Sequence, residues 1–209
     1  MEKEHTSQEA PTASAANNWL NAEPLVLASA SPRRAEILRA VGWPFSVAAA
    51  NIDETPHAGE DPTVYVERLA RAKAEAVARA LTSGLVLGAD TVVVLDGEIL
   101  GKPRDDADAT RMLRALRGRW HEVLTGVALV RAGAFVQCVA VAHERTRVCV
   151  AALADAEIER YVATGEPDDK AGAYAIQGRA ALFIEAVEGD YWNIVGLPVR
   201  LVYELARGA

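Results

Sequence analysis

Residues 27–34 read Leu-Ala-Ser-Ala-Ser-Pro-Arg-Arg, and this stretch joins a buried strand to a helix. The apolar run over residues 25–28 predicts the end of the strand. Ser31 is a good helix N-cap, and Pro32 suits the first helical turn, where its missing N–H would have no partner. The stretch therefore predicts a strand that leads directly into a capped helix.

The same junction carries chemistry suited to a polyphosphate. A helix start offers free backbone N–H groups and a partial positive charge. The hydroxyls of Ser29 and Ser31 and the guanidinium groups of Arg33 and Arg34 are expected to converge on it. The alternative interpretation is an ordinary capped helix with exposed arginines, because Ser-x-Ser-Pro-Arg-Arg is not a general phosphate-binding motif. From this stretch alone, both interpretations stay open.

Beyond this junction, the chain mixes apolar strands with amphipathic helices. Apolar runs and turn residues predict strands at residues 25–28, 45–49, 85–95, 98–100, 122–130, 135–150 and 181–187. Apolar stripes and capping residues, among them Asp61 and Asp155, predict helices at residues 33–41, 62–81, 105–118, 155–163 and 195–206. The two kinds of element do not alternate strictly. We therefore predict an α/β protein with a mixed central sheet, flanking helices and two lobes around a substrate cleft.

Length and composition limit the classes of protein that remain. The 209 residues, 51% of them apolar, suit a single domain at residues 23–209, preceded by a disordered extension at residues 1–22. The net charge of −7 argues against nonspecific nucleic-acid binding, although a local cation cluster can still hold a small anion. The chain has no apolar run of membrane-spanning length and no signal-peptide core, so we expect no membrane partner. Cys138 and Cys149 are expected to be buried free thiols, which favours a cytoplasmic location.

Three charged residues stand out elsewhere in the chain. Asp90 lies in the most apolar strand, where a carboxylate is costly to bury unless a cation, a metal or hydrogen bonds compensate it. We favour a general base or metal ligand over a structural aspartate bonded to backbone amides. Lys73 shares the buried stripe of its helix and, taken alone, is most simply explained by snorkelling to solvent. Lys102, before Pro103, is by itself an ordinary loop lysine.

The segment 165–178 is dense in turn-forming residues, so it is either flexible or shaped around a ligand. Its Gln177 carries an amide that can read a nucleobase edge as both donor and acceptor. His121 and His143 have no partner at a recognisable spacing and are expected to be structural. The chain lacks the P-loop, the G-x-G-x-x-G fingerprint, the G-x-S-x-G elbow and the H-E-x-x-H helix. The commonest NTPase, dehydrogenase, esterase and protease interpretations are thereby removed.

Seven short segments together resemble the Maf family of nucleoside triphosphate pyrophosphatases. They stand in the family's order, at residues 29–34, 88–93, 101–103, 121–126, 169–174, 176–178 and 189–198. Each segment alone is weak, but the set is very specific, and the resemblance runs from about Leu25 to the C-terminus. It implies an ITPase-like two-lobed fold, a homodimer, and hydrolysis of nucleoside triphosphates to a monophosphate and pyrophosphate with Mg²⁺ or Mn²⁺.

The resemblance also implies roles for individual residues. Asp90 matches the family's proton acceptor, and Glu54 matches a metal or water ligand, although the adjacent Asp53 leaves the choice of acid open. Gln177 and the segment 169–172 point to the branch that acts on dTTP and UTP. The expected site residues are catalytic Asp90, Lys73, Lys102 and Glu54, substrate-binding Ser29, Ser31, Arg33, Arg34, Thr91 and Gln177, and metal-binding Glu54 and Asp90.

The residue chemistry supports this reaction without the resemblance. The arginines and lysines of the set, a divalent cation and the helix start would neutralise the roughly four negative charges of a triphosphate. Asp90 would activate the nucleophile, and Thr91 and Gln177 would hydrogen-bond the base. The alternative, which the resemblance also implies, is a nucleotide-binding regulatory module that affects cell division and does not need Asp90. A pure polyanion binder, however, gains nothing from carboxylates at the phosphates unless a metal bridges them.

Overall fold

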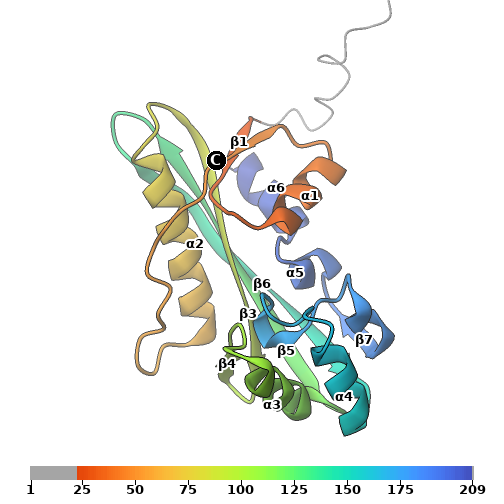
Figure 1. Cartoon of the computed structure of the whole chain (residues 1–209). Coiled ribbons are helices and arrows are strands. Elements are labelled where there is room, and N and C mark those ends of the chain that lie inside the picture. Colours follow the sequence, from red (N-terminus) through yellow and green to blue (C-terminus); the bar gives the residue numbers. More distant parts are fainter. Residues whose placement is uncertain (1–22, 209) are drawn as a thin grey trace, which may run out of the picture.

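The computed structural model describes residues 23–208, and a single mixed sheet of seven strands runs through them (Figure 1). The strand order is β2-β1-β3-β5-β6-β7, with β4 paired to β3. Strands β2, β1 and β3 are parallel, and the other pairs are antiparallel. The bounds are β1 Leu25–Leu27, β2 Phe45–Val47, β3 Gly84–Leu95, β4 Glu98–Leu100, β5 Trp120–Ala132, β6 Gln137–Val150 and β7 Ile184–Glu188. The predicted α/β class with a mixed central sheet is confirmed, and the predicted disordered extension lies outside the described residues.

The helices form two layers, one on each face of the sheet (Figure 1). They are α1 Pro32–Ala40, α2 Pro62–Ala78, α3 Asp106–Leu116, α4 Asp155–Val162, α5 Tyr191–Val195 and α6 Val199–Arg207. Helix α2 covers one face alone, and the remaining helices cover the other. On that second face, α1, α5 and α6 share one apolar cluster, and α3 and α4 share another. These two clusters form the two predicted lobes.

The middle of strand β3 carries two of the predicted site residues, Asp90 and Thr91. Side chains alternate between the faces of a strand, so Asp90 faces α2, whereas Thr91 faces the opposite layer. On one side, β1 pairs with residues 85–87 of β3, and β4 pairs with residues 93–95. Residues 88–92 lie between these two partners and pair only with β5 on the other side. The sheet therefore has a notch at Asp90. Ligands of α/β sheets commonly bind in such a crevice, where neighbouring strands part.

The C-terminal part departs most from the predicted elements. The last helix, predicted at 195–206, is found as α6 but starts only at Val199, and the short helix α5, which ends at Val195, was not predicted. Gly196, with φ of 118°, ends the first helix in a left-handed conformation, and Pro198 starts the second. The strand predicted at 181–187 begins only at Ile184, because residues 179–182 form a 3₁₀ turn.

The other differences are smaller. Helix α2 ends at Ala78 rather than near residue 81, and α4 is capped by Ala154 rather than Asp155. Cys138 and Cys149 are free thiols as predicted, but they are half-buried rather than buried. Among the described residues, no helix is long and apolar enough to cross a membrane.

Candidate functional site

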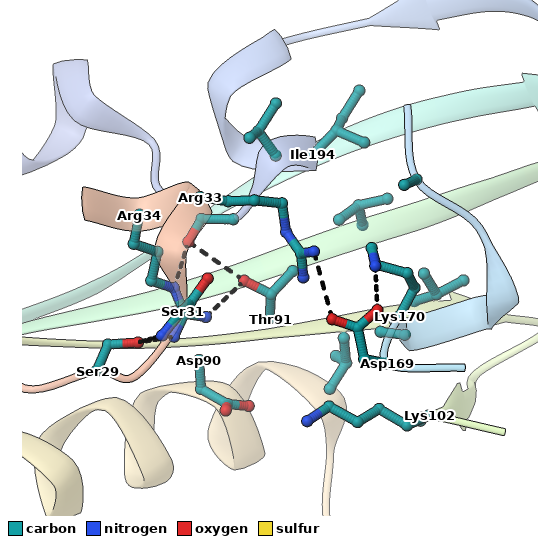
Figure 2. Close-up of a pocket in the computed structure, with 18 of the residues that line it drawn as sticks. Ser29, Ser31, Arg33, Arg34, Asp90, Thr91, Lys102, Asp169, Lys170 and Ile194 are labelled. Carbon is teal, nitrogen blue, oxygen red and sulfur yellow. Dashed lines mark hydrogen bonds and ion pairs between the residues drawn. The ribbon is translucent and has the colours of Figure 1, made fainter. Parts of the chain in front are cut away.

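A cavity of about 650 Å³ opens at the notch of the sheet (Figure 2). Its walls come from the start of α1, the middle of β3, the loop after β2, the segment 169–177 and the end of α5. All ten predicted site residues line it. The charged lining residues are the cationic Arg33, Arg34, Lys73, Lys102 and Lys170 and the acidic Glu54, Asp90 and Asp169. The cavity thus combines a cation cluster with a smaller set of carboxylates.

A buried lysine lies between two carboxylates on the α2 side of this cavity. Lys73 Nζ is 2.6 Å from Asp90 Oδ1 and 2.7 Å from Glu54 Oε1. Lys73 and Asp90 are both buried, whereas about half of the Glu54 side chain is exposed. The interpretation of Lys73 as a snorkelling lysine is therefore wrong, because its ammonium turns inward to a carboxylate partner. Asp90 Oδ2 has no hydrogen-bond donor among residues 23–208.

The surroundings of Asp90 tune its acidity. Burial raises the pKa of this carboxyl group, while the nearby charges of Lys73 and Arg34 oppose the rise. A carboxylate with a raised pKa and one unpartnered oxygen is suited to accept a proton from water. Asp53, in contrast, accepts hydrogen bonds from the backbone N–H of Thr55 at 2.9 Å and from its hydroxyl at 2.6 Å. Of the two adjacent acids, Glu54 is the one that reaches Lys73.

Arg34 is buried, but its guanidinium group has no carboxylate within ion-pair distance in the described part of the chain. Its Nε donates to the carbonyl oxygen of Gly196 at 2.7 Å, and its two terminal nitrogens donate to Ser29 Oγ at 3.0 Å and Thr91 Oγ1 at 3.1 Å. Burial lowers the pKa of Arg34, and Asp90 opposes this effect. Three of the five N–H donors are thus used. The interpretation of an ordinary helix with exposed arginines is wrong for Arg34, which is buried at the cavity.

The start of α1 remains open toward the cavity. Ser31 occupies the N-cap position with extended backbone angles, but its side chain makes no capping hydrogen bond. Its backbone N–H donates instead to Ser29 Oγ at 3.2 Å. The first N–H groups of α1 therefore remain available to an anionic ligand at a helix N-terminus.

The remaining cations are Arg33, which comes from the start of α1 like Arg34, and Lys102 and Lys170, which lie across the cavity. Arg33 is half-buried and contacts Asp169 at 3.6 Å, and Lys170 pairs with the same carboxylate (Figure 2). Lys102 is exposed and has no ion-pair partner within residues 23–208. Asp169 and Lys170 were quoted in the resemblance but not predicted as site residues. Their place in a turn-rich segment next to Gln177 was the available signal.

Gln177 is exposed at the cavity, in a segment that is fixed at both ends. Before it, the N–H of Ala175 donates to Tyr161 Oη at 3.3 Å, and Tyr161 donates to Glu166 Oε1 at 2.9 Å. After it, the N–H of Arg179 donates to Glu166 Oε2 at 3.0 Å. Glu166, which the sequence analysis did not single out, thus holds the segment in a shape that presents Gln177.

The carboxylates at the cavity decide whether it could hold a divalent cation. The described residues contain no group of three or more His, Cys, Asp or Glu side chains placed to hold a metal ion. Asp90 and Glu54 nevertheless offer carboxylates on both sides of Lys73 Nζ. Mg²⁺ is commonly bound by one or two carboxylates together with substrate phosphates. These two residues therefore fit a cation that binds with a nucleotide.

Comparison with known proteins finds one family profile and several curated relatives that cover most of the chain. The family profile described as "Maf-like protein" matches residues 24–209. The chain is similar to the dTTP/UTP pyrophosphatase of Koribacter versatilis (strain Ellin345), with 52% identity over 185 residues, 88% of this chain and 94% of the relative. The dTTP/UTP pyrophosphatase of Moorella thermoacetica (strain ATCC 39073 / JCM 9320) is 55% identical over 181 residues, 87% of this chain and 92% of the relative. A solved structure titled "The structure of the Staphylococcus aureus Ham1 protein" matches with 20% identity and a TM-score of 0.45, over 64% of this chain and 73% of that one.

Proposed function

The chain belongs to the Maf family, and from this premise we propose that it hydrolyses dTTP and UTP to a nucleoside monophosphate and pyrophosphate. The observation that carries the proposal is the buried Lys73 between Asp90 and Glu54, on the wall of a cavity lined by five cations. A polyanion binder needs the cations but not the carboxylates. An enzyme that must activate water beside a polyphosphate needs both.

The cations position the triphosphate. Arg34 and the open start of α1 offer N–H donors from one wall, and Lys102 and Lys170 offer ammonium groups from the other. Charge that develops on the leaving pyrophosphate would be stabilised by these fixed groups, which need no reorganisation during the reaction. Positioning and electrostatics would thus supply most of the rate, as in phosphoryl transfer generally.

Asp90 acts as the general base. Lys73 holds its Oδ1 and keeps the carboxylate oriented, so Oδ2 is left to accept a proton from water. The water oxygen attacks the α-phosphorus, the bond to the bridging oxygen breaks, and pyrophosphate leaves with that electron pair. Mg²⁺ or Mn²⁺, held by Asp90 and Glu54 when bound, would neutralise phosphate charge and polarise the scissile linkage.

The nucleobase is read at the opposite end of the cavity. Thymine and uracil each offer two carbonyl acceptors and one N–H donor, and the Gln177 amide can pair with both kinds of group. Ile176 and Ile194 add apolar side chains to the cavity lining. A site built to pair with particular groups of a base rejects analogues that leave its polar groups unpaired.

Product analysis by chromatography tests the reaction. The purified protein is incubated with a panel of nucleoside triphosphates and Mg²⁺ or Mn²⁺, with the isosteric Asp90→Asn variant as control. We expect monophosphate and pyrophosphate, formed fastest from dTTP and UTP, and a loss of about 10²-fold to 10⁴-fold in the variant. Circular dichroism would check that the variant folds.

Other products would overturn the proposal in distinguishable ways. Diphosphate and phosphate would mean that a different bond is cleaved. Nucleotide binding without turnover under every metal condition would favour the regulatory module. Turnover close to wild type in a folded Asp90→Asn protein would remove Asp90 from the role of base.

The proposal includes the homodimer that the family resemblance implies and the cytoplasmic location that the cysteine usage favours. Sedimentation of the purified chain would measure the first, and fractionation of cells would measure the second. Neither is needed for the chemistry described above, because every residue used comes from one chain.

A further inference from the structure

A row of buried polar side chains lies behind Arg34 and crosses the sheet. Thr125 on β5, Thr146 on β6 and Asn193 on α5 are all fully buried. Thr125 Oγ1 lies 2.9 Å from Thr91 Oγ1 and 3.0 Å from the backbone oxygen of Asn193. The row thus connects Thr91, which lines the cavity, to helix α5. The mechanism proposed above does not use it.

Counting protons fixes the direction of each hydrogen bond in the row. A threonine hydroxyl has one proton to donate. The carbonyl of Asn193 can only accept, so Thr125 donates to it. Thr91 then donates its own proton to Thr125 at 2.9 Å rather than to the more distant carbonyl of Gly196 at 3.5 Å, which leaves its lone pairs to accept from Arg34 at 3.1 Å. Thr91 has no proton left for a nucleobase, so toward the substrate it can act only as an acceptor.

Asn193 also fixes the second support of Arg34. Its side-chain nitrogen donates to the carbonyl of Val123 and to Thr146 Oγ1, both at 2.9 Å. These two bonds fasten α5 to β5 and β6. Three residues further on, the carbonyl of Gly196 accepts from Arg34 Nε at 2.7 Å. Both the Thr91 contact and the Gly196 contact of Arg34 therefore depend on Asn193.

We infer that Thr125 and Asn193 are positioning residues, which hold the Arg34 guanidinium plane toward the triphosphate. The inference rests on the proposed function for the role of Arg34 in phosphate binding. All the acceptors that hold Arg34 are uncharged: two hydroxyls and one backbone carbonyl. They orient the guanidinium group without neutralising it, whereas a carboxylate in their place would compete with the phosphate. The segments 121–126 and 189–198 thereby gain a role in the site.

A double-mutant cycle tests the inference through activity. Thr125→Val keeps the size of the side chain and removes the hydroxyl, and Thr125→Ser is the matched control that keeps it. We expect Thr125→Val to lower kcat/KM for dTTP about tenfold, and Thr125→Ser to restore most of it. In an Arg34→Lys background, Thr125→Val should change kcat/KM by less than about twofold, because the group it positions is gone. An equal loss in both backgrounds, or no loss in the first, would overturn the inference.

A second readout does not depend on turnover. It is the rate at which the Nε–H proton of Arg34 exchanges with solvent, measured by NMR. The signal is assigned by its absence from the NMR spectrum of Arg34→Lys. This proton should exchange slowly in the wild type and in Thr125→Ser. It should exchange faster in Thr125→Val, and equal rates would overturn the inference. If the wild type forms no pyrophosphate but the exchange rates differ, the proposed function fails while the positioning of Arg34 stands. Should Thr125→Val not fold, Thr125→Ala removes the same hydroxyl with a smaller side chain.

Discussion

Buried charge is the common feature of the residues at the centre of the cavity. Lys73 and Asp90 compensate each other at 2.6 Å, so neither is left unpaired in an apolar region. Arg34 is buried with hydrogen bonds only, and its charge is not balanced by a contacting carboxylate. Burying such a group is unfavourable in the free protein. A phosphate that binds there would relieve this cost, which strengthens binding at that residue.

His121 predicts a pH dependence of stability. It is buried, its Nε2 lies 2.8 Å from Tyr174 Oη, and burial lowers its pKa from 6.5 to about 4. The unfolded chain therefore takes up a proton below about pH 6.5, while the folded chain does so only below about pH 4. The free energy of unfolding should fall as the pH drops through this window, by up to roughly 3 kcal/mol from His121.

Urea unfolding of the wild type and His121→Gln between pH 7 and pH 4 would measure this effect. Glutamine keeps a hydrogen-bonding group but does not titrate. The stability advantage of the wild type should shrink as the pH falls, because only the wild type gains a protonatable site on unfolding. A difference that stays constant with pH would show that His121 titrates alike in both states.

At the scale of elements, two glycines let α2 lie directly on the sheet. A Cβ at Gly88 would lie 2.0 Å from the carbonyl oxygen of Ala70, and one at Gly126 would lie 2.3 Å from that of Val66. Both glycines face α2, and Gly126 is opposite Asp90 in the sheet. Because α2 lies so close to the sheet, Lys73 of α2 reaches Asp90 of β3.

Gly88→Ala should therefore affect stability and activity together. The added methyl group meets rigid backbone, so α2 must shift, which typically costs about 1–3 kcal/mol. Thermal unfolding should show a melting temperature lower by about 2–10 °C, and kcat should fall because Lys73 moves from Asp90. Gly133→Ala is the control, since its Cβ meets only an oxygen at 3.9 Å in the β5–β6 hairpin. A Gly88→Ala protein as stable and active as the control would contradict this account.

Elements that adjacent residues specify could be predicted, whereas those that a longer pattern hides could not. The Asp96-Gly97 hairpin was predicted and found, with both residues at positive φ, because a turn is specified by adjacent residues. The break between α5 and α6 was missed, since the apolar pattern continues across Gly196 and hides the glycine–proline signal.

The site shows the same limit. The family resemblance identified ten residues that all line the cavity, yet the pairing of Lys73 with Asp90 depends on how α2 crosses the sheet. Thr125 and Asn193 were quoted within motifs, but their contact spans 68 residues of chain, which no local pattern reveals.

At the scale of the whole molecule, the two lobes share the long strands β3 and β5. β3 contributes Leu87 to the cluster under α1 and α6 and Val93 to the cluster under α3. β5 does the same with Leu129 and Val123. The cavity lies between these clusters, at the notch, so substrate contacts come from both lobes. A net charge of −7 is thus compatible with an anionic substrate, because the cations gather where the lobes meet.

Shared strands predict that both lobes unfold together. Trp43 packs against Tyr203 in the α1–α6 lobe, while Trp120 begins β5 at the end of the sheet that the α3–α4 lobe covers. Two variants that each keep one of these tryptophans, with the others replaced by phenylalanine, would report each lobe by fluorescence in urea. We expect coincident midpoints, because neither cluster can lose its strands while the other keeps them. Midpoints that differ beyond error would instead show that residues 23–209 contain two cooperative units, and that the cavity can be lost by melting one lobe alone.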